Sequence, residues 1–473
     1  MKTNFSEAQL SDSAIAQADA ILGTCQHFGF CTSGCPTYVL LHDENDGTRG
    51  RIDLIKEMLE SDAPPTPKTV GHIDRCLSCM SCMTTCAVKV DYLHLVDIAR
   101  AHIEENYKRP LPERFIRNAL AYILPRPALF RAALGVGRIG VKARRLVPAS
   151  MRHYLDIIPA RPAPQQRLAT PANLTCYPAQ GERKWRVALL AGCVQPMLSP
   201  NINAATIRVL NQAGCEVIIP ASAGCCGSLT LHMGKQGAAK ASAIKNVQAW
   251  VREMDGEGLD AILVNASGCG STVKDYAHLL AQESDHIEPA RRVAQIAMDI
   301  SEWLGKIDLP APSTPKRFRV AYHDACSLRN VQKVTQPPRR LLSKAGFQVA
   351  DIPEAHFCCG SAGTYNLLQP ELARQLGQRK AENIQRVAPQ IIAAGNIGCI
   401  TQIHLYEKTP IVHTIELLDW AYGGPCPPAL EGVELTELAE PSGQSASTSI
   451  QEQPIFISKP DTGSQGNDDV GVW

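Results

Sequence analysis

The chain has 473 residues, a formal net charge of +1 and 18 cysteines. Its length is sufficient for about two to four domains with hydrophobic cores, and its charge gives no reason to expect nucleic acid as a partner. Most cysteines stand in clustered, metal-type spacings, which favours metal binding in a reducing compartment over a disulfide framework. Because the N-terminus lacks an apolar signal core and no apolar run reaches about 18 residues, we expect a cytoplasmic protein without membrane-spanning helices.

Residues 1–107 predict a helical domain built around two cysteine runs. Apolar side chains recur at helical spacing in three segments, and the turn-rich segment 43–51 predicts a loop. The predicted helices are 7–23, 52–59 and 91–106. Helices that frame two cysteine runs are typical of a ferredoxin-like module, so we expect this domain to carry two iron–sulfur clusters.

The second of these runs is complete, with the spacing C-x2-C-x2-C-x3-C over residues 76–86. Three thiolates at this spacing hold one iron–sulfur cubane and the fourth points to another cluster, so a partner run is expected elsewhere. Structural zinc instead uses two CxxC pairs with a longer gap between them. We predict one [4Fe–4S] cluster with four ligands: Cys76, Cys79, Cys82 and Cys35.

The partner run lies upstream and lacks one cysteine. It consists of Cys25, Cys31 and Cys35, followed by Pro36. The spacing of the complete run would place another cysteine at position 28. Phe28 stands there instead, and a phenyl ring has no donor atom for iron. We therefore predict an altered cluster held by Cys25, Cys31 and Cys86. A three-iron [3Fe–4S] cluster, a cubane with water or His27 as fourth ligand, and an empty site all remain open.

Residues 108–161 are basic, with twelve Lys and Arg against two acidic residues. Prolines divide this apolar-rich stretch into short helices. Such a segment can lie on an anionic membrane, dock on an acidic partner, or serve only as a solvated linker, and the sequence leaves these alternatives open. We assign 108–184 to a basic helical linker or docking segment. The G-x-G-x-x-G string at 135–140 is discounted as a dinucleotide site because no strand precedes it.

From Trp185 the pattern changes to alternating strands and helices, and it occurs twice. Each copy has a cysteine after its first strand, a Cys-Cys-Gly string after its second strand and a cysteine after its third strand. The corresponding cysteines of the two copies are separated by 133, 133 and 130 residues. This regularity predicts an internal duplication into two α/β repeats, 185–310 and 311–423. The predicted strands are 187–191, 216–220, 261–264 and 347–352, and the strings 320–326 and 391–399 each predict one more strand that leads to a cysteine. The predicted helices are 200–212, 235–254, 338–345 and 371–387.

Ligands of open parallel sheets bind at the carboxyl ends of the strands, where these cysteines stand. We therefore predict a metal cluster in each repeat, although buried structural cysteines are an alternative. The candidate ligands are Cys193, Cys225, Cys226 and Cys269 in the first repeat and Cys326, Cys358, Cys359 and Cys399 in the second. His232, His323 and His356 stand near these motifs and could ligate or tune a cluster, but loop histidines with satisfied hydrogen bonds are more common. Cys176, Cys215 and Cys426 fall outside the patterns, and 424–473 is expected to be mostly disordered.

Several longer strings carry a resemblance to a known family. They are Cys-x-x-Phe-Gly-Phe-Cys-Thr-x-x-Cys-Pro-Thr-Tyr (25–38), Asp-Glu-Asn-Asp-Gly (43–47), Arg-Gly-Arg (49–51), Lys-Arg-Pro-Leu-Pro-Glu-Arg (108–114), Ala-Ser-Gly-Cys-Gly (266–270) and Cys-Cys-Gly-Ser-Ala-Gly-Thr-Tyr (358–365). With these strings the chain resembles the iron–sulfur subunit of bacterial glycolate oxidase over about residues 20–422. Its Cys-Cys-Gly halves also resemble those of heterodisulfide reductases.

The resemblance implies an electron-transfer subunit rather than a complete enzyme. A separate FAD-binding subunit would oxidise glycolate to glyoxylate, and this chain would pass the electrons towards a membrane quinone, with peripheral contact to the inner membrane as an open point. No acid–base residue is assigned to this chain. Three departures stand out: Phe28, Ala87 where ferredoxins have proline, and Thr272 and Gln402 where the wider Cys-Cys-Gly pattern ends C-x-x-C.

Three rival functions remain. The chain could itself be a reductase whose Cys-Cys-Gly centres act on a disulfide, it could serve a lactate-oxidising system, or it could be a scaffold without redox function.

Overall fold

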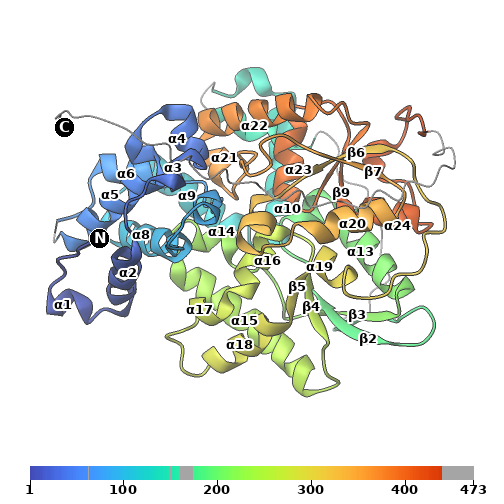
Figure 1. Ribbon diagram of the computed structural model, residues 1–473, viewed down its shortest axis with the longest axis horizontal. Coiled ribbons are helices and arrows are strands. Elements are labelled where there is room, and N and C mark those ends of the chain that lie inside the picture. The colour runs from blue at the N-terminus through green and yellow to red at the C-terminus, as the bar shows by residue number, and fades with distance from the viewer. Residues whose placement is uncertain (62, 149–150, 160–173, 439–473) are drawn as a thin grey trace, which may run out of the picture. The chain divides into compact units, whose positions relative to one another are not determined.

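The computed structural model describes residues 1–61, 63–148, 151–159 and 174–438, and residues 1–437 form a single unit (Figure 1). The N-terminal part is helical, as predicted. Its helices are α1 (Glu7–Leu10), α2 (Ser13–Thr24), α3 (Phe30–Ser33), α4 (Pro36–Leu41), α5 (Thr48–Glu60), α6 (Pro67–Asp74), α7 (Ser81–Thr84) and α8 (Tyr92–Asn106). Helices α2, α5 and α8 enclose one apolar core that includes Leu22, Ile55 and Leu95.

Two details of this part differ from the sequence-based expectation. The helix predicted over 7–23 is divided because the Asp12 carboxylate accepts a hydrogen bond from the Ala14 amide and caps α2, which is a typical N-cap arrangement. The loop predicted over 43–51 ends early: α5 begins at Thr48, after a 3-10 turn over Glu44–Asp46.

Residues 108–159 form helices whose starts follow the prolines. Helix α9 (Leu111–Ile123) has Pro112 in its first turn, and α10 (Pro127–Lys142) begins at Pro127, positions where the missing N–H costs nothing. A 3-10 turn over Arg144–Leu146 and α11 (His153–Asp156) follow. Residues 135–140 lie inside α10, which confirms that the G-x-G-x-x-G string is not a dinucleotide loop.

The first repeat is a five-stranded sheet with the strand order β1-β3-β2-β4-β5, in which β1 alone is antiparallel to its neighbour. Its strands are β1 (Leu174–Tyr177), β2 (Trp185–Leu189), β3 (Cys215–Pro220), β4 (Ala261–Val264) and β5 (Ala297–Asp299). Its helices are α12 (Gln195–Leu198), α13 (Asn201–Gln212), α14 (Ser228–Leu231), α15 (Gln236–Asp255), α16 (Ser267–Lys274), α17 (Tyr276–Leu279), α18 (Ile287–Ile296) and α19 (Ile300–Leu304).

The second repeat is a parallel sheet with the order β7-β6-β8-β9. Its strands are β6 (Arg319–His323), β7 (Gln348–Asp351), β8 (Ile391–Ala394) and β9 (Ile411–His413). Its helices are a π-helical turn (Ser327–Val331), α20 (Gln336–Lys344), α21 (Tyr365–Leu368), α22 (Pro370–Gln385), α23 (Ile397–His404) and α24 (Thr414–Ala421). Apart from the additional strand β1, the two sheets have the same order. The first strand of each repeat lies between the second and the third, and the fourth lies beside the third. The predicted α/β fold with duplicated repeats is therefore confirmed.

The two repeats share one apolar core, and each repeat also has a buried cluster of its own. Side chains from β2, α13, β6 and α24 belong to the same buried cluster, for example Val187, Leu210, Val320 and Leu417. The His413 ring also lies 2.9 Å from the main-chain oxygen of Asn265, across the two repeats. Because this core is continuous, the carboxyl ends of the two sheets are held in a fixed relation.

The end of the described chain packs on this body. A 3-10 turn covers Pro428–Leu430, Leu430 is buried in the shared core, and the Gln390 side chain donates to the Thr436 oxygen at 2.6 Å. The disorder expected from residue 424 therefore does not apply to this stretch, and residues 439–473 lie outside the described residues. Among the described helices, none is both long and apolar enough to cross a membrane.

Candidate iron–sulfur sites

The complete cysteine run begins after α6 with a tight loop that holds Cys76 and Cys79, and Cys82 lies in α7. Ser78 and Met80 have φ angles of 49° and 55°, a left-handed backbone that turns the loop sharply between the cysteines. Four thiols are buried here, those of Cys76, Cys79, Cys82 and, from the N-terminus of α4, Cys35. Burial raises the pKa of Cys82, and the neighbouring Cys76 and Cys35 raise that pKa further. The structure thus places the four predicted ligands in one group.

A buried arginine, Arg51, lies beside this group, and no role was assigned to it from the sequence. The Arg51 guanidinium donates to the Cys35 sulfur at 3.7 Å and to the main-chain oxygen of His72 at 2.8 Å. It also pairs with Asp46 at 3.3 Å, and Asp46 is held by Arg75 at 2.7 Å. A cluster with thiolate ligands is anionic, so this fixed positive charge would stabilise a cluster bound here.

The second N-terminal group lies around a cavity of about 40 Å³. Its walls include the predicted ligands Cys25, Cys31 and Cys86, together with Cys82 of the first group. Burial, followed by the neighbouring Cys25, raises the pKa of Cys31 to about 11. The structure therefore brings the three thiols of the incomplete run together.

Phe28 borders the same cavity and is 59% exposed, so its ring caps the opening without offering a ligand. His27 also lines the cavity, and its Nε2 lies 3.5 Å from an Asp53 oxygen.

All eight cysteines predicted in the repeats line one cavity of about 270 Å³. The sulfurs of Cys193 and Cys225 lie 3.5 Å apart, and those of Cys326 and Cys358 lie 4.0 Å apart. Cys76 also borders this cavity, as do Leu124 and Phe130 of the α9–α10 region. The two Cys-Cys-Gly sites are thus parts of one hollow rather than remote from each other.

The glycine of each Cys-Cys-Gly string is required by its backbone. Gly227 and Gly360 have φ angles of 90° and 91°, and a Cβ would meet the oxygens of Ala239 and Ala373 at 3.0 and 2.7 Å. In this conformation each glycine amide donates to the first sulfur of its pair, at 3.5 Å to Cys225 and 3.4 Å to Cys358. The turn therefore presents both thiols and a donor to the cavity.

Donors lower the pKa and favour the thiolate form at Cys225 in the first repeat and at Cys358 and Cys399 in the second. Hydrogen bonds from the Cys193 and Cys226 thiols lower the pKa of Cys225 to about 3, against the effect of burial. A hydrogen bond from Cys359 lowers the pKa of Cys399 to about 5. All 18 cysteines are free thiols, and fifteen of them lie in the groups described above. Thiolates are the ligands that iron–sulfur clusters take, so the residues present fit such clusters.

The three histidines near the motifs have different surroundings. A ring nitrogen of His323 lies within 4.8 Å of the sulfurs of Cys359 and Cys399. His232 instead pairs with Asp97 at 3.5 Å, and His356 packs edge-on against Phe357. Among these three described histidines, His323 alone belongs to a group of close potential ligand atoms, although His232 also borders the shared cavity.

Thr272 and Gln402, at the departures from the wider pattern, make structural hydrogen bonds. The Thr272 hydroxyl donates to the Gly268 oxygen at 3.4 Å within α16. The Gln402 side chain donates to the Ala373 oxygen at 2.9 Å and accepts from Asn366 at 3.1 Å. Of the cysteines outside the patterns, Cys176 is exposed and Cys215 is buried in the apolar core.

One contact between cysteines of the N-terminal part and the second repeat could not be predicted from the sequence. Cys79 of the N-terminal group and Cys358 of the second repeat belong to the same small buried cluster, with Tyr365 and Leu376. Burial, followed by the neighbouring Cys358, raises the pKa of Cys79. Residues almost 280 positions apart cannot be paired by spacing alone.

Comparisons with known proteins place these groups in a wider context. Residues 187–274 and 320–404 match the family described as cysteine-rich domain (CCG). The chain is 40% identical to the glycolate oxidase iron-sulfur subunit of Escherichia coli strain K12 over 423 residues, which cover 89% of this chain and 99% of that protein. It is 31% identical to the probable glycolate oxidase iron-sulfur subunit of Bacillus subtilis strain 168, covering 84% and 94%. It is 26% identical to lactate utilization protein A of Oceanobacillus iheyensis, covering 50% and 96%.

Proposed function

The chain belongs to the family of glycolate oxidase iron–sulfur subunits, and we propose that it carries electrons from a separate FAD-binding subunit, which oxidises glycolate to glyoxylate, to a membrane quinone. Membership makes it an electron-transfer iron–sulfur subunit of an oxidoreductase complex with a catalytic partner subunit. The flavin chemistry, the quinone and the direction of transfer are the proposed steps.

The observation that carries the proposal is the continuity of the thiol groups. Cys82 belongs to the first N-terminal group and borders the cavity of the second. Cys79 adjoins Cys358 of the second repeat, and all eight repeat thiols share one cavity. Sites arranged in this way can relay electrons without a long gap between neighbours.

Iron–sulfur clusters, when bound, supply one-electron transfer over a wide range of potentials. The chain's own residues hold and tune them. Burial of the thiols excludes water, Arg51 places a positive charge beside Cys35, and the Gly227 and Gly360 amides donate to ligand sulfurs. Hydrogen bonds and charges of this kind raise the potential of a site.

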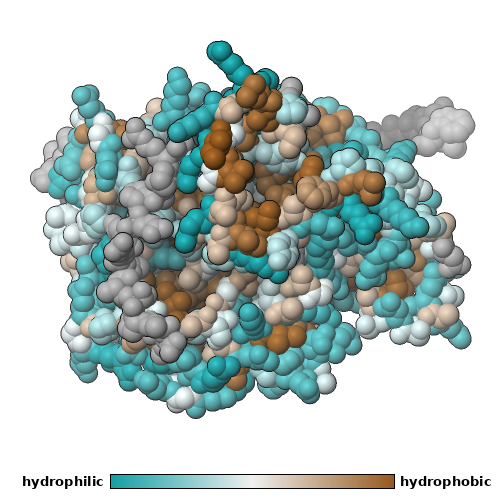
Figure 2. Space-filling view, turned by 180° about the vertical axis from the view of Figure 1, so that it is seen from behind, coloured by the Kyte–Doolittle hydropathy of each residue, from teal (hydrophilic) through white to brown (hydrophobic). Residues whose placement is uncertain are grey.

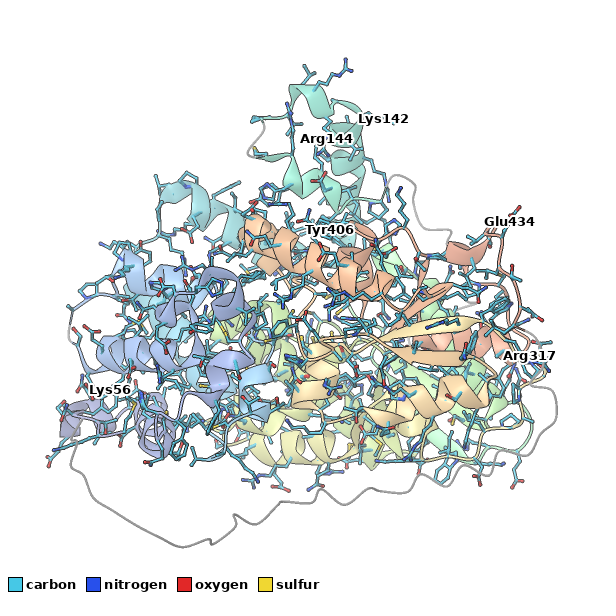
Figure 3. The ribbon with its side chains drawn as sticks, turned by 45° about the horizontal axis from the view of Figure 1, so that its top comes forward. Lys56, Lys142, Arg144, Arg317, Tyr406 and Glu434 are labelled. Carbon is cyan, nitrogen blue, oxygen red and sulfur yellow. The ribbon has the colours of Figure 1, made fainter. Side chains whose placement is uncertain are left out.

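A membrane-bound acceptor is supported by an exposed basic and apolar surface on α9, α10 and the turn after them. Its large apolar side chains are exposed: Leu111, Phe115, Tyr122, Val136, Ile139 and Leu146. Figure 2 shows hydrophobic residues gathered along the ridge at the top of the view, where the turquoise helices of Figure 1 lie, and Figure 3 places Lys142 and Arg144 on the same raised helices. Exposed apolar groups beside basic ones are typical of peripheral binding to anionic lipid.

The acidic residues of this surface are neutralised. Glu113 pairs with Arg109 and Arg117, and Asp156 pairs with Arg144. The remaining basic side chains therefore give the surface a net positive charge. We propose that it rests on the anionic inner membrane, which brings the cavity wall at Leu124 and Phe130 near a lipid-soluble acceptor.

One observation favours a second candidate. Both repeat quartets face a single hollow, which would suit a reductase that cleaves a disulfide between two cluster sites. Turnover of a disulfide by this chain with an artificial electron donor, in the absence of any flavin subunit, would favour that function. The similarity to lactate utilization protein A also makes lactate an alternative hydroxy acid.

The test is an anaerobic preparation of the chain with its partner subunits. Iron and acid-labile sulfide are measured first, and low-temperature EPR is recorded before and after addition of glycolate or lactate. Reduction of several distinct centres by glycolate, followed by reoxidation with a quinone analogue, supports the proposal. Iron sufficient for the Cys76 run alone would contradict the relay through the repeats, and faster reduction by lactate would reassign the substrate.

A further inference from the structure

The two repeats differ at the end of their first strands. Residues 186–193 and 319–326 align without a gap at an offset of 133, so that Cys193 corresponds to Cys326. At the same offset, His323 corresponds to Leu190. Both side chains are buried, but only the imidazole offers a ligand atom. The duplicated sites are therefore not chemically equivalent.

His323 is placed as a ligand would be. It is 2% exposed, and one ring nitrogen lies within 4.8 Å of the sulfurs of both Cys359 and Cys399, which are themselves within that distance of each other. Its buried Nε2 has no hydrogen-bond partner among the described residues. A buried polar atom without a partner is costly, and coordination to iron would remove that cost.

Two other side chains of the second repeat act in the same direction. The Asn396 side chain donates to the Cys399 sulfur at 3.3 Å, whereas Ala266 stands at the corresponding position of the first repeat and has no donor. Buried Lys380 donates to the Glu354 oxygen at 3.1 Å, and the thiols of Cys358 and Cys359 lie close enough to act on its charge. Donors and positive charge near a cluster favour its reduced form.

We propose that a ring nitrogen of His323 binds iron at the second Cys-Cys-Gly site in place of one of the four candidate thiolates, and that the centre of the second repeat consequently has a higher reduction potential than that of the first. The proposal rests on the proposed function in one respect, since it requires that both repeats hold clusters. A neutral imidazole adds less negative charge than a thiolate, and histidine ligation raises the potential of iron–sulfur centres for this reason.

The consequence concerns the path of electrons. The second repeat is the one that adjoins Cys79 of the N-terminal group. A higher potential there draws electrons from the N-terminal clusters into the shared cavity.

The experiment uses the full-length chain in its complex and compares the wild type with His323→Leu, which reproduces the residue of the first repeat. Leu190→His is the matched reciprocal variant. Protein labelled with ¹⁵N only in histidine is examined by pulsed EPR, and each centre is titrated with redox mediators. Iron content and thermal melting establish that each variant is folded and loaded, and His323→Gln serves if the leucine variant does not load.

We expect a directly bound histidine nitrogen in the wild type that disappears in His323→Leu, together with a lower midpoint potential of that one centre. Leu190→His should leave the His323 coupling in place. If the His323→Leu protein is loaded with iron and its nitrogen coupling is unchanged, the inference is overturned and the proposed relay is unaffected. The same holds if the wild type shows no histidine coupling, even when the substitution shifts the midpoint potential. Wild-type protein without iron in either repeat would instead contradict the proposed function, and the inference with it.

Discussion

The Asn330 side chain donates a hydrogen bond to the main-chain oxygen of Cys79 at 2.8 Å, joining the π-helical turn of the second repeat to the cysteine loop of the N-terminal part. Next to this bond, Cys79 and Cys358 share one buried cluster. The contact between the N-terminal thiols and the repeats is therefore built from a specific hydrogen bond as well as apolar packing.

Asn330→Ala should weaken this contact. The Cys79 oxygen would lose its donor in a buried place, which costs about 1–3 kcal/mol. We expect a matching decrease in the free energy of unfolding, measured by denaturant titration, and slower transfer of electrons from the N-terminal clusters to the repeats in rapid-mixing experiments. Asn106→Ala is the control, because Asn106 is exposed and bonds only within its own helix. Equal effects of the two substitutions would contradict a specific role for Asn330.

Phe28→Cys should complete the first cysteine run. Phe28 lines the cavity of Cys25, Cys31 and Cys86, so a thiol at this position faces the vacant corner of the frame. We expect the EPR signal of an oxidised three-iron cluster in the wild type and its loss in the variant, with about one more iron atom per chain. Phe28→Ser removes the same ring without adding a ligand, and it should retain the three-iron signal. Identical spectra for wild type and Phe28→Cys would mean that this site holds no three-iron cluster.

His94 should make stability depend on pH. Its two ring nitrogens lie 2.5 Å from Asp91 and 3.1 Å from Asp275, and the ring stacks on His278. Burial lowers the pKa of His94, but the hydrogen bonds to Asp275 and Asp91 outweigh it and raise this pKa to about 10. Because the ordinary pKa is about 6.5, the ion pairs contribute fully below about pH 6.5 and are lost as the pH rises through about 10.

His94→Gln should therefore lower the free energy of unfolding by about 2–4 kcal/mol near pH 6 and by much less near pH 10. Denaturant titrations at several pH values measure this. His102→Gln on the same helix is the control, because burial lowers the pKa of His102 and no such alkaline loss is expected. A destabilisation by His94→Gln that is the same at pH 6 and pH 10 would show that the ion pairs do not cause it.

The exposed surface of α10 should mediate binding to anionic vesicles. Val136 and Ile139 are 71% and 68% exposed on this helix, and Asp at both positions would introduce charge where apolar groups enter the lipid. We expect co-sedimentation of the complex with anionic vesicles to fall about tenfold or more, since each side chain loses roughly 1 kcal/mol or more of transfer free energy. Binding of the wild type should also decrease at high salt.

The control for this experiment is Val433→Asp, another exposed valine far along the chain. It should leave vesicle binding unchanged. If the protein that carries both Val136→Asp and Ile139→Asp still binds the vesicles, membrane contact belongs to another surface or to a partner subunit.

Much of the fold follows from local patterns. The strand predicted over 261–264 is β4, and the helices predicted over 200–212 and 235–254 lie within one residue of α13 and α15 at their ends. These segments are predictable because their apolar periodicity repeats over many residues. The short strands β5 and β9 and the antiparallel β1 were not expected, since three or four residues carry too little periodicity and their pairing depends on the neighbouring strand.

The sequence by itself determined which cysteines form each group, because ligand spacing within a run and the offset between repeats are properties of the chain order. It also determined the duplication and the family. The tertiary structure alone decided that Cys79 meets Cys358, that one cavity joins both repeats, and that a His323 nitrogen lies within 4.8 Å of two thiols. These relations arise where separate elements pack against one another, and packing between distant segments leaves no periodic trace in either of them.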